Sequence, residues 1–193
     1  DGIRERDGAE MKVSLMTNAG NTTREDIGVY VQNQLKQVGI DVEIAATTYN
    51  QFQEKVRKGS YQLFMWGWVA DYPDPENFLF LLHGPQSRAK SQGENASNYV
   101  NPEFDALFER MRNMPNSSER QKIIDRMTEI FRHDAPWIGG FHPVSYGLAH
   151  AWMGNGKPNN MARNNIKYLR VDIDKRAALR RAWNRPVLWP ALL

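Results

Sequence analysis

The 193-residue chain has 25 basic and 22 acidic side chains, a formal net charge of +3, 41% hydrophobic residues and no Cys. An aromatic content of 11% with so small a net charge excludes a disordered chain, and the apolar runs fall well short of the ~20 residues of a membrane span. The absence of Cys excludes a disulfide scaffold, a Cys-ligated zinc site and a thiol nucleophile, and leaves the compartment open. Basic and acidic residues are interspersed, which argues against a nucleic-acid partner.

Strand-like and helix-like patterns alternate through the first third of the chain. Strands are expected at 13–17, 40–44 and 61–68, and helices at 22–38 and about 49–58. Gly39 and Gly59 fit the left-handed ends of the two helices. The run at 61–68 is apolar and aromatic with no breaker before Gly67, which suits a buried strand. This order predicts an α/β layer with a parallel or mixed sheet flanked by helices.

Helix starts are marked by capping boxes, in which a Ser or Thr side chain accepts the third amide while a Glu or Gln reaches back. Such boxes occur at Thr22 and Glu25, Thr48 and Gln51, and Ser118 and Gln121. Asn101 and Pro102 begin a further helix, and Pro136 ends the long helix that follows it. The remaining predicted segments are an extended stretch at 138–152, a polar loop at 154–165, a last helix at about 175–183 and a Pro-bounded stretch at 186–193.

The usual signatures of catalysis and metal binding are missing. The sequence has four His residues: His83, His133, His142 and His150. Their spacing is not that of metal ligands. No nucleophile elbow, P-loop or dinucleotide fingerprint is present, so acyl, phosphoryl and hydride transfer lack their motifs. We therefore expect no catalytic residues, no metal site and no cofactor.

One segment, 66–78, gathers aromatic and acidic side chains directly after the predicted buried strand, at the edge where α/β sheets bind ligands. These side chains are Trp66, Trp68, Asp71, Tyr72, Asp74 and Glu76. An enzyme would pair the carboxylates as general acid and base, as a glycosidase does. A purely structural turn would use Asp74 and Glu76 to cap a helix that starts near Asn77. A binding site would combine aromatic walls with one placed anion, which suits a ligand that carries a cation.

Residues 67–79 resemble the signature of the peptide-type (family 5) solute-binding proteins of bacterial ABC importers. They read GWxADYPDPxNFL, where x marks a position outside the signature. A second stretch, NYxNPEFDAL at 98–107, follows at the distance seen in that family, and the helix of Arg120 that ends at 134–136 also matches. The resemblance covers about residues 8–150 and is weak from Trp152 onward.

The resemblance implies a lobe of a two-lobed fold like that of type II periplasmic binding proteins. Residues 1–150 would form the C-terminal ligand-binding lobe, and residues 151–193 a tail that returns toward the N-terminal lobe of the same protein. Asp71 would pair with the N-terminal ammonium of an oligopeptide in the cleft between the lobes, and Trp68 would wall a side-chain pocket. Weaker candidates, chosen by proximity to the two motifs, are Trp66, Tyr72, Asn98 and Tyr99.

Two positions depart from the pattern of some relatives. Val69 stands where they carry a Cys beside the signature Trp, so no disulfide forms within the lobe. Met65 stands before Trp66, so no basic residue there clamps the C-terminal carboxylate of a short peptide. The length of the ligand therefore stays open.

The sequence thus predicts a non-enzymatic, substrate-binding component that delivers peptides to the membrane subunits of an ABC importer. It would work in the periplasm or at the extracellular face, with or without a lipid anchor. Three alternatives stay open: a glycosidase-like hydrolase that uses Asp71 and Glu76, an interaction module, and another ligand of the family such as a nickel complex, haem, an opine or a sugar. Because the chain begins at Asp1 without a leader, we expect a processed or excised chain.

Overall fold

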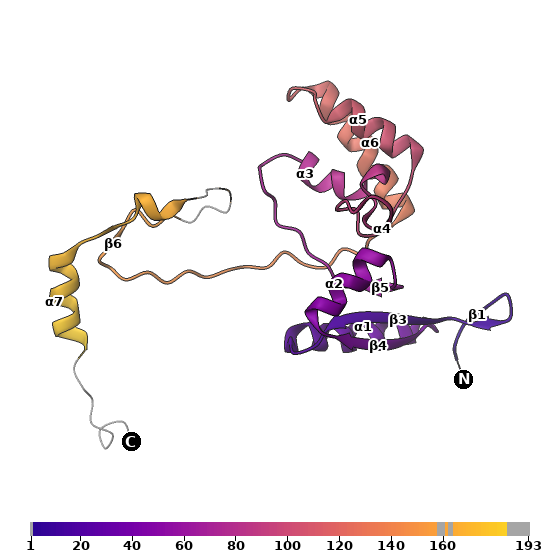
Figure 1. Ribbon diagram of the computed structural model, residues 1–193, viewed down its shortest axis with the longest axis horizontal. Helices are drawn as coiled ribbons and strands as arrows, with labels where there is room; N and C mark the ends of the chain where they lie inside the picture. Colours follow the sequence, from indigo (N-terminus) through magenta and orange to yellow (C-terminus); the bar gives the residue numbers. More distant parts are fainter. Residues whose placement is uncertain (1, 158–160, 162–163, 185–193) are drawn as a thin grey trace, which may run out of the picture. The chain divides into compact units, whose positions relative to one another are not determined.

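The structure is a computed structural model that describes residues 2–157, 161 and 164–184. The chain divides into two units, residues 1–138 and 139–193, and each is described by itself (Figure 1). The predicted division at residue 150 concerns the lobes of a longer protein and stays a prediction. No helix among the described residues is both long and apolar enough to cross a membrane.

The first unit is built on a three-stranded parallel sheet in the order β4–β3–β5. Its elements, in chain order, are β1 (Glu5–Arg6), β2 (Ala9–Glu10), β3 (Lys12–Asn18), α1 (Thr22–Gln37), β4 (Asp41–Thr47), α2 (Tyr49–Lys58) and β5 (Leu63–Phe64). Strands β3 and β4 pair along their whole length, and α1 lies along them (Figure 1). Helix α2 covers β3 with Phe52 and Val56, which are buried with Met16 and Ala96 in one cluster. The predicted α/β class is confirmed.

The third predicted strand, 61–68, is wrong in its length. Only Leu63 and Phe64 pair with β3, and residues 65–70 have no regular structure. The rings of Phe64 and Trp66 contact Phe52 of helix α2 and the Trp68 ring contacts Phe80, in place of packing on the two faces of a long strand. The Trp66 ring stacks on Phe52 with 5.8 Å between centroids, whereas Val69 is 76% exposed.

At two of the three predicted capping boxes the cap is the preceding residue, so the predicted Thr22 and Ser118 caps are wrong. The cap of α1 is Asn21, whose side chain accepts the N–H three residues on, and Thr22 is already helical. The cap of α6 (Ser118–Asp134) is Ser117 and not Ser118. In each case the earlier residue has the extended backbone of a cap, and its side chain is an equally good acceptor. The box at Thr48 is confirmed, with both of its hydrogen bonds present.

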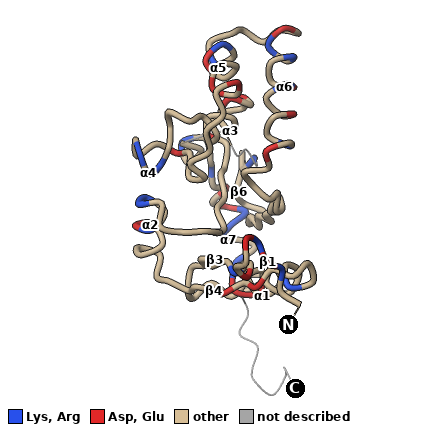
Figure 2. The backbone as a smooth tube through the Cα atoms, turned by 90° about the vertical axis from the view of Figure 1, so that its right-hand side faces the viewer, with Lys and Arg blue, Asp and Glu red and all other residues tan. Residues whose placement is uncertain are grey.

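The second half of the first unit is helical. Its elements are α3 (Glu76–Leu79), α4 (Arg88–Ser91), α5 (Pro102–Met111), α6 (Ser118–Asp134) and 3-10 turns at Phe80–Leu82 and Gly84–Gln86. Helices α5 and α6 pack side by side (Figure 1) over a core of Leu82, Phe104, Phe108, Met111, Ile123, Met127 and Ile130. Residues of both charge signs occur along α5 and α6 (Figure 2). Among them, Arg126 of α6 and Glu103 of α5 form an ion pair at 2.8 Å.

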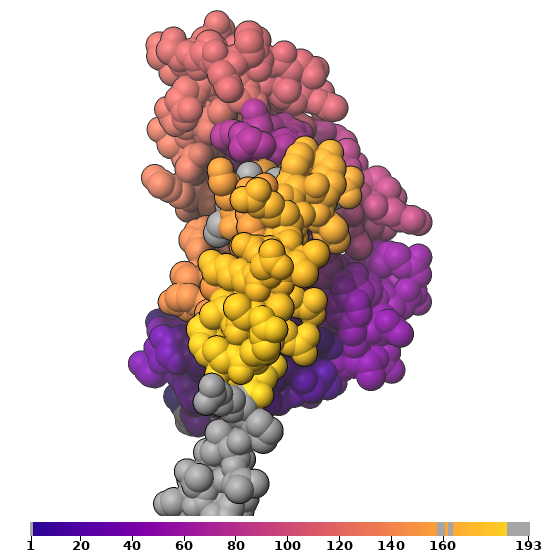
Figure 3. Space-filling model, turned by 90° about the vertical axis from the view of Figure 1, so that its left-hand side faces the viewer, coloured from indigo at the N-terminus to yellow at the C-terminus, as the bar shows by residue number. Residues whose placement is uncertain are grey.

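The second unit contains β6 (Met153–Gly154), a 3-10 turn (Asn165–Tyr168), β7 (Arg170–Val171) and α7 (Ile173–Trp183). Strands β6 and β7 pair antiparallel, and α7 follows directly (yellow in Figure 3), which confirms the last predicted helix. Arg176 and Arg180 of α7 line a pocket with His150 and Trp152, whose rings stack 4.0 Å apart. The predicted loop at 154–165 is only partly described, and the stretch 186–193 lies outside the described residues.

Candidate functional site

The segment between β5 and α3 holds the residues that the sequence singles out, and a buried amide organises it. Asn77, in the first turn of α3, is 3% exposed. Its Oδ1 accepts a hydrogen bond from Trp68 Nε1 at 3.0 Å and another from the backbone N–H of Asp71 at 2.9 Å. One oxygen therefore joins the two residues that the sequence predicts to bind ligand. The residue Asp71 itself is exposed.

Tyr72 lies on the same loop and is linked to the same amide. Its hydroxyl donates to the carboxylate of Glu76, and this hydrogen bond is the main reason that the pKa of Tyr72 is raised. A side-chain hydrogen bond with Asn77 acts in the opposite direction on that pKa. The Glu76 carboxylate is thus engaged by a neighbouring phenol within its own loop.

Asp74 fastens the loop to helix α6. Its Oδ1 accepts the backbone N–H of Glu76 at 2.8 Å and pairs with Arg120 Nη2 at 2.7 Å. The Arg120 guanidinium lowers the pKa of Asp74 below its usual value. The Asp74 carboxylate therefore has a structural function, because it holds the backbone N–H of Glu76 at the start of α3 and the guanidinium of Arg120, although the N-cap residue of α3 is Pro75.

Arg120 is the residue whose function the sequence reasoning missed. It is 4% exposed, and besides Asp74 it donates to the carbonyl of Met111 at 3.2 Å and to Asn116 Oδ1 at 2.9 Å. A signal was present: an Arg in the first turn of a helix opposes the helix dipole, which favours acidic residues there. Such an Arg requires an acidic partner from elsewhere in the chain, and Asp74 provides it.

The two indoles of the segment face different surroundings. Trp68 packs edge-to-face on Phe80, with 5.5 Å between centroids and 70° between planes, while its N–H is held by Asn77. Trp66 stacks on Phe52 of α2, and the Arg88 guanidinium lies 5.8 Å from the centre of its ring. Trp66 is 37% exposed and so retains a solvent-facing surface.

Asn98 and Tyr99, the candidates from the second motif, make contacts elsewhere in the first unit. The Asn98 side chain accepts from Ser87 Oγ at 2.7 Å and donates to the Tyr61 hydroxyl at 2.7 Å. The Tyr99 hydroxyl donates to Asp134; burial and this carboxylate raise the pKa of Tyr99 to about 12, and the hydrogen bond lowers the pKa of Asp134 to about 2. The loop at 66–77 therefore brings together Trp68, Asp71 and Tyr72, and these hydrogen bonds tie Asn98 and Tyr99 to other residues.

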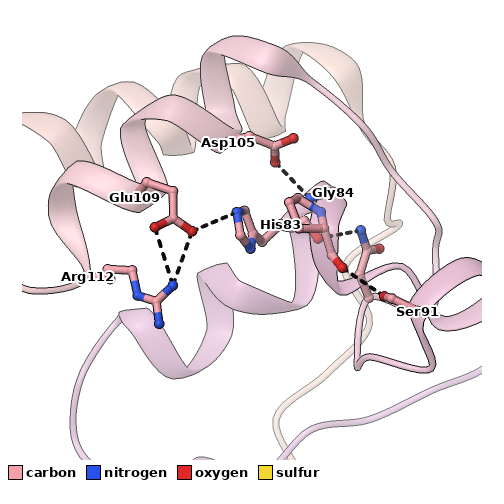
Figure 4. A network of polar contacts seen from close by, with 8 residues as sticks. His83, Gly84, Ser91, Asp105, Glu109 and Arg112 are labelled. Atoms are coloured by element: carbon pink, nitrogen blue, oxygen red, sulfur yellow. Dashed lines mark hydrogen bonds and ion pairs between the residues drawn. The ribbon is translucent and has the colours of Figure 1, made fainter.

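A second polar cluster surrounds His83 (Figure 4). Its ring is 3% exposed, packs on Phe108, and has Nε2 3.2 Å from Glu109 Oε1, which also pairs with Arg112 at 3.1 Å. Burial lowers the pKa of His83 and favours its neutral form. Gly84 N–H donates to Asp105 Oδ1 at 2.7 Å (Figure 4). Across the described ranges, no three His, Asp or Glu side chains form a group that could hold a metal ion.

Comparison of the sequence with known proteins finds a matching family model and similar binding proteins. The family model of bacterial extracellular solute-binding proteins, family 5, middle part, matches residues 1–90. The chain is 26% identical over 136 residues to di/tripeptide-binding protein 4 of Pseudomonas aeruginosa strain UCBPP-PA14, which covers 70% of this chain and 25% of that protein. It is 26% identical over 134 residues to heme-binding protein A of Haemophilus influenzae, covering 69% of this chain and 24% of the relative.

A solved structure supports the same relationship. The oligopeptide-binding protein AppA of Bacillus subtilis, in complex with a nonapeptide, superposes with a TM-score of 0.61 and 29% identity. The match covers 70% of this chain and 26% of that one. These relatives are named as solute-binding proteins and not as enzymes, which supports a non-enzymatic function. The chain spans about a quarter of the length of the relatives it matches, and its residues 1–90 are similar to the bacterial extracellular solute-binding proteins of family 5.

Proposed function

We propose that this chain forms the ligand-binding lobe of a peptide-binding protein that serves an ABC importer. The observation that carries the proposal is the shared hydrogen bonding of Trp68 and Asp71 to Asn77, which fixes an indole beside an exposed acidic residue. An indole wall next to an anion suits a ligand with an ammonium beside a side chain, as at the N-terminus of a peptide. The names of two relatives, a di/tripeptide-binding and an oligopeptide-binding protein, support peptides as the ligand class.

Asp71 is assigned to the N-terminal ammonium of the peptide, in a cleft completed by the N-terminal lobe of the same protein. A charge-assisted hydrogen bond of this type contributes about 1.5–3 kcal/mol and sets the register of the peptide. Trp68 and Trp66 provide apolar walls for side chains, and Tyr72 lies at the edge of the same loop. Sequence-independent hydrogen bonds to the peptide backbone would allow many peptides to bind.

The partners follow from this assignment. The ligand-loaded protein would dock on the membrane subunits of the importer, in the periplasm or at the extracellular face. The family name and the relatives support this location. No enzymatic step is assigned to the chain.

The decisive substitution is Asp71→Asn in the complete protein, with binding measured by calorimetry. The probes are tetra-alanine with a free N-terminus and its N-acetylated form. We expect Asp71→Asn to weaken binding of the free peptide about 10- to 100-fold, because the ammonium loses its counter-ion. The acetylated peptide should bind the wild type and the variant equally, since it carries no ammonium.

The matched control is Asp26→Asn, which removes an exposed carboxylate from helix α1. This substitution should change neither the affinity for free tetra-alanine nor the affinity for its acetylated form. If Asp71→Asn leaves the affinity for the free peptide unchanged, the assignment of Asp71 to the ammonium is wrong.

A second candidate ligand is haem, which the name of the Haemophilus influenzae relative favours. The exposed part of the Trp66 ring, which stacks on the buried Phe52, would suit a flat porphyrin. Titration of the complete protein with haem, followed by the absorbance of the haem, distinguishes a haem ligand from a peptide ligand. A saturable spectral shift that tetra-alanine cannot displace would favour haem.

A further inference from the structure

Asn77 stands apart from the other buried polar side chains of the first unit because its partners belong to the proposed site. Its Oδ1 accepts from the Trp68 indole and from the Asp71 backbone. A carbonyl oxygen has two lone pairs, and both are used here. Two residues of one candidate site therefore depend on one amide.

The amide is itself held rigidly in the fold. Asn77 is 3% exposed, and the chain that follows it enters the core at Leu81 and Leu82. On its other side, the Asp74 carboxylate is fixed by the buried Arg120 of α6. The loop is thus anchored at both ends of the 74–77 turn, and the position of Asn77 Oδ1 follows from core packing.

We infer that Asn77 is the positioning residue of the ligand site: it sets the distance between the Trp68 ring and the Asp71 carboxylate and so determines the preference for a ligand ammonium. The inference rests on the proposed function. A binding group that is ordered before the ligand arrives avoids the entropic cost of ordering it on binding. Loss of the amide leaves two donors, the Trp68 N–H and the Asp71 N–H, without their acceptor.

Substitution by Leu tests the inference, because it keeps the branched shape and the number of side-chain heavy atoms of Asn and removes both hydrogen bonds. The quantity measured is the ratio of the dissociation constants of acetylated and free tetra-alanine in the complete protein. We expect Asn77→Leu to reduce this ratio about tenfold, a loss of 1.4 kcal/mol of discrimination. Asn77→Asp keeps an acceptor at the same position, so its ratio should stay at or above that of the wild type.

A second readout reports the hydrogen bond directly. The indole N–H of Trp68, assigned in the NMR spectrum by Trp68→Phe, should exchange with solvent faster in Asn77→Leu than in Asn77→Asp. If the leucine variant does not fold, Asn77→Ser provides the same test, since its hydroxyl is too short to reach both donors. Asn101→Ala, which removes the N-cap of α5 in the same unit, controls for loss of stability and should leave the ratio unchanged.

The outcomes separate the inference from the proposed function. If Asp71→Asn abolishes the preference for the free peptide but Asn77→Leu retains it, the inference is wrong and the proposed function stands. If Asp71→Asn itself has no effect on the ratio, the proposed function fails first. If both reduce the ratio and Asn77→Asp retains it, the positioning role of Asn77 is supported.

Discussion

Arg120 illustrates how one buried charge can support a loop that lies far from it in sequence. Its side chain is 5% exposed and contacts three acceptors, of which Asp74 belongs to the candidate site. Breaking a buried ion pair on one side is costly because the remaining charge has no counter-ion. Arg120 therefore stabilises both the start of α6 and the turn that presents Asp71.

Replacement of Arg120 by Met should lower the free energy of unfolding by about 3 kcal/mol, since the Asp74 carboxylate loses its partner. Urea unfolding of wild type and variant measures this difference. Arg126→Met is the matched control on the same helix, because its pair with Glu103 is about half exposed on both sides, and its cost should stay within about 1 kcal/mol. Equal losses in the two variants would contradict the structural importance of Arg120.

At the candidate site, the sequence places the candidate residues in one loop but does not show how their side chains are held. The position of Trp68 and Asp71 in one loop follows from their closeness in the chain. The use of Asn77 as their common acceptor cannot be read from spacing, because it depends on how the turn at 73–75 folds back. The ion pair of Asp74 and Arg120 joins residues 46 positions apart in the chain. Contacts between such distant residues cannot be predicted from the pattern of a single sequence.

At the scale of elements, patterns of apolar residues predict helices well and strand lengths poorly. Helices at 22–38, 49–58 and 175–183 are confirmed within a few residues, because their periodicity is long and their ends carry Gly or capping residues. The run at 61–68 has the composition of a strand, yet only two of its residues pair. Composition indicates that the rings pack on other side chains, and it does not distinguish a sheet from a helix surface as the partner.

The cap of α6 gives a direct test at this scale, because Ser117 and Ser118 are adjacent and chemically identical. The Ser117 side chain accepts the N–H of Arg120 at 3.1 Å, whereas Ser118 is the first helical residue. Ser117→Ala should therefore cost about 1 kcal/mol of stability and Ser118→Ala very little. Thermal unfolding of the two variants compares them, and the reverse order would restore the cap that the sequence pattern predicts.

At the scale of the whole molecule, the first unit contains both of the clusters of buried apolar residues and the entire candidate site. The second unit has no fully buried residue among its described positions. Its side chains at 139–148 include large apolar groups that are mostly exposed, among them Tyr146 at 91% and Val144 at 75%. The return of residues 151–193 toward an N-terminal lobe stays a prediction.

The stretch 139–149 has a practical consequence for the chain on its own. Its backbone makes no hydrogen bond to another described residue and has no regular structure, and proteases prefer such accessible, extended backbone. Chymotrypsin should therefore cut first after Phe141, Tyr146 or Leu148, and mass spectrometry should find a resistant fragment that ends near residue 141. First cuts within α5 or α6 would show that the helical core is less stable than its packing indicates.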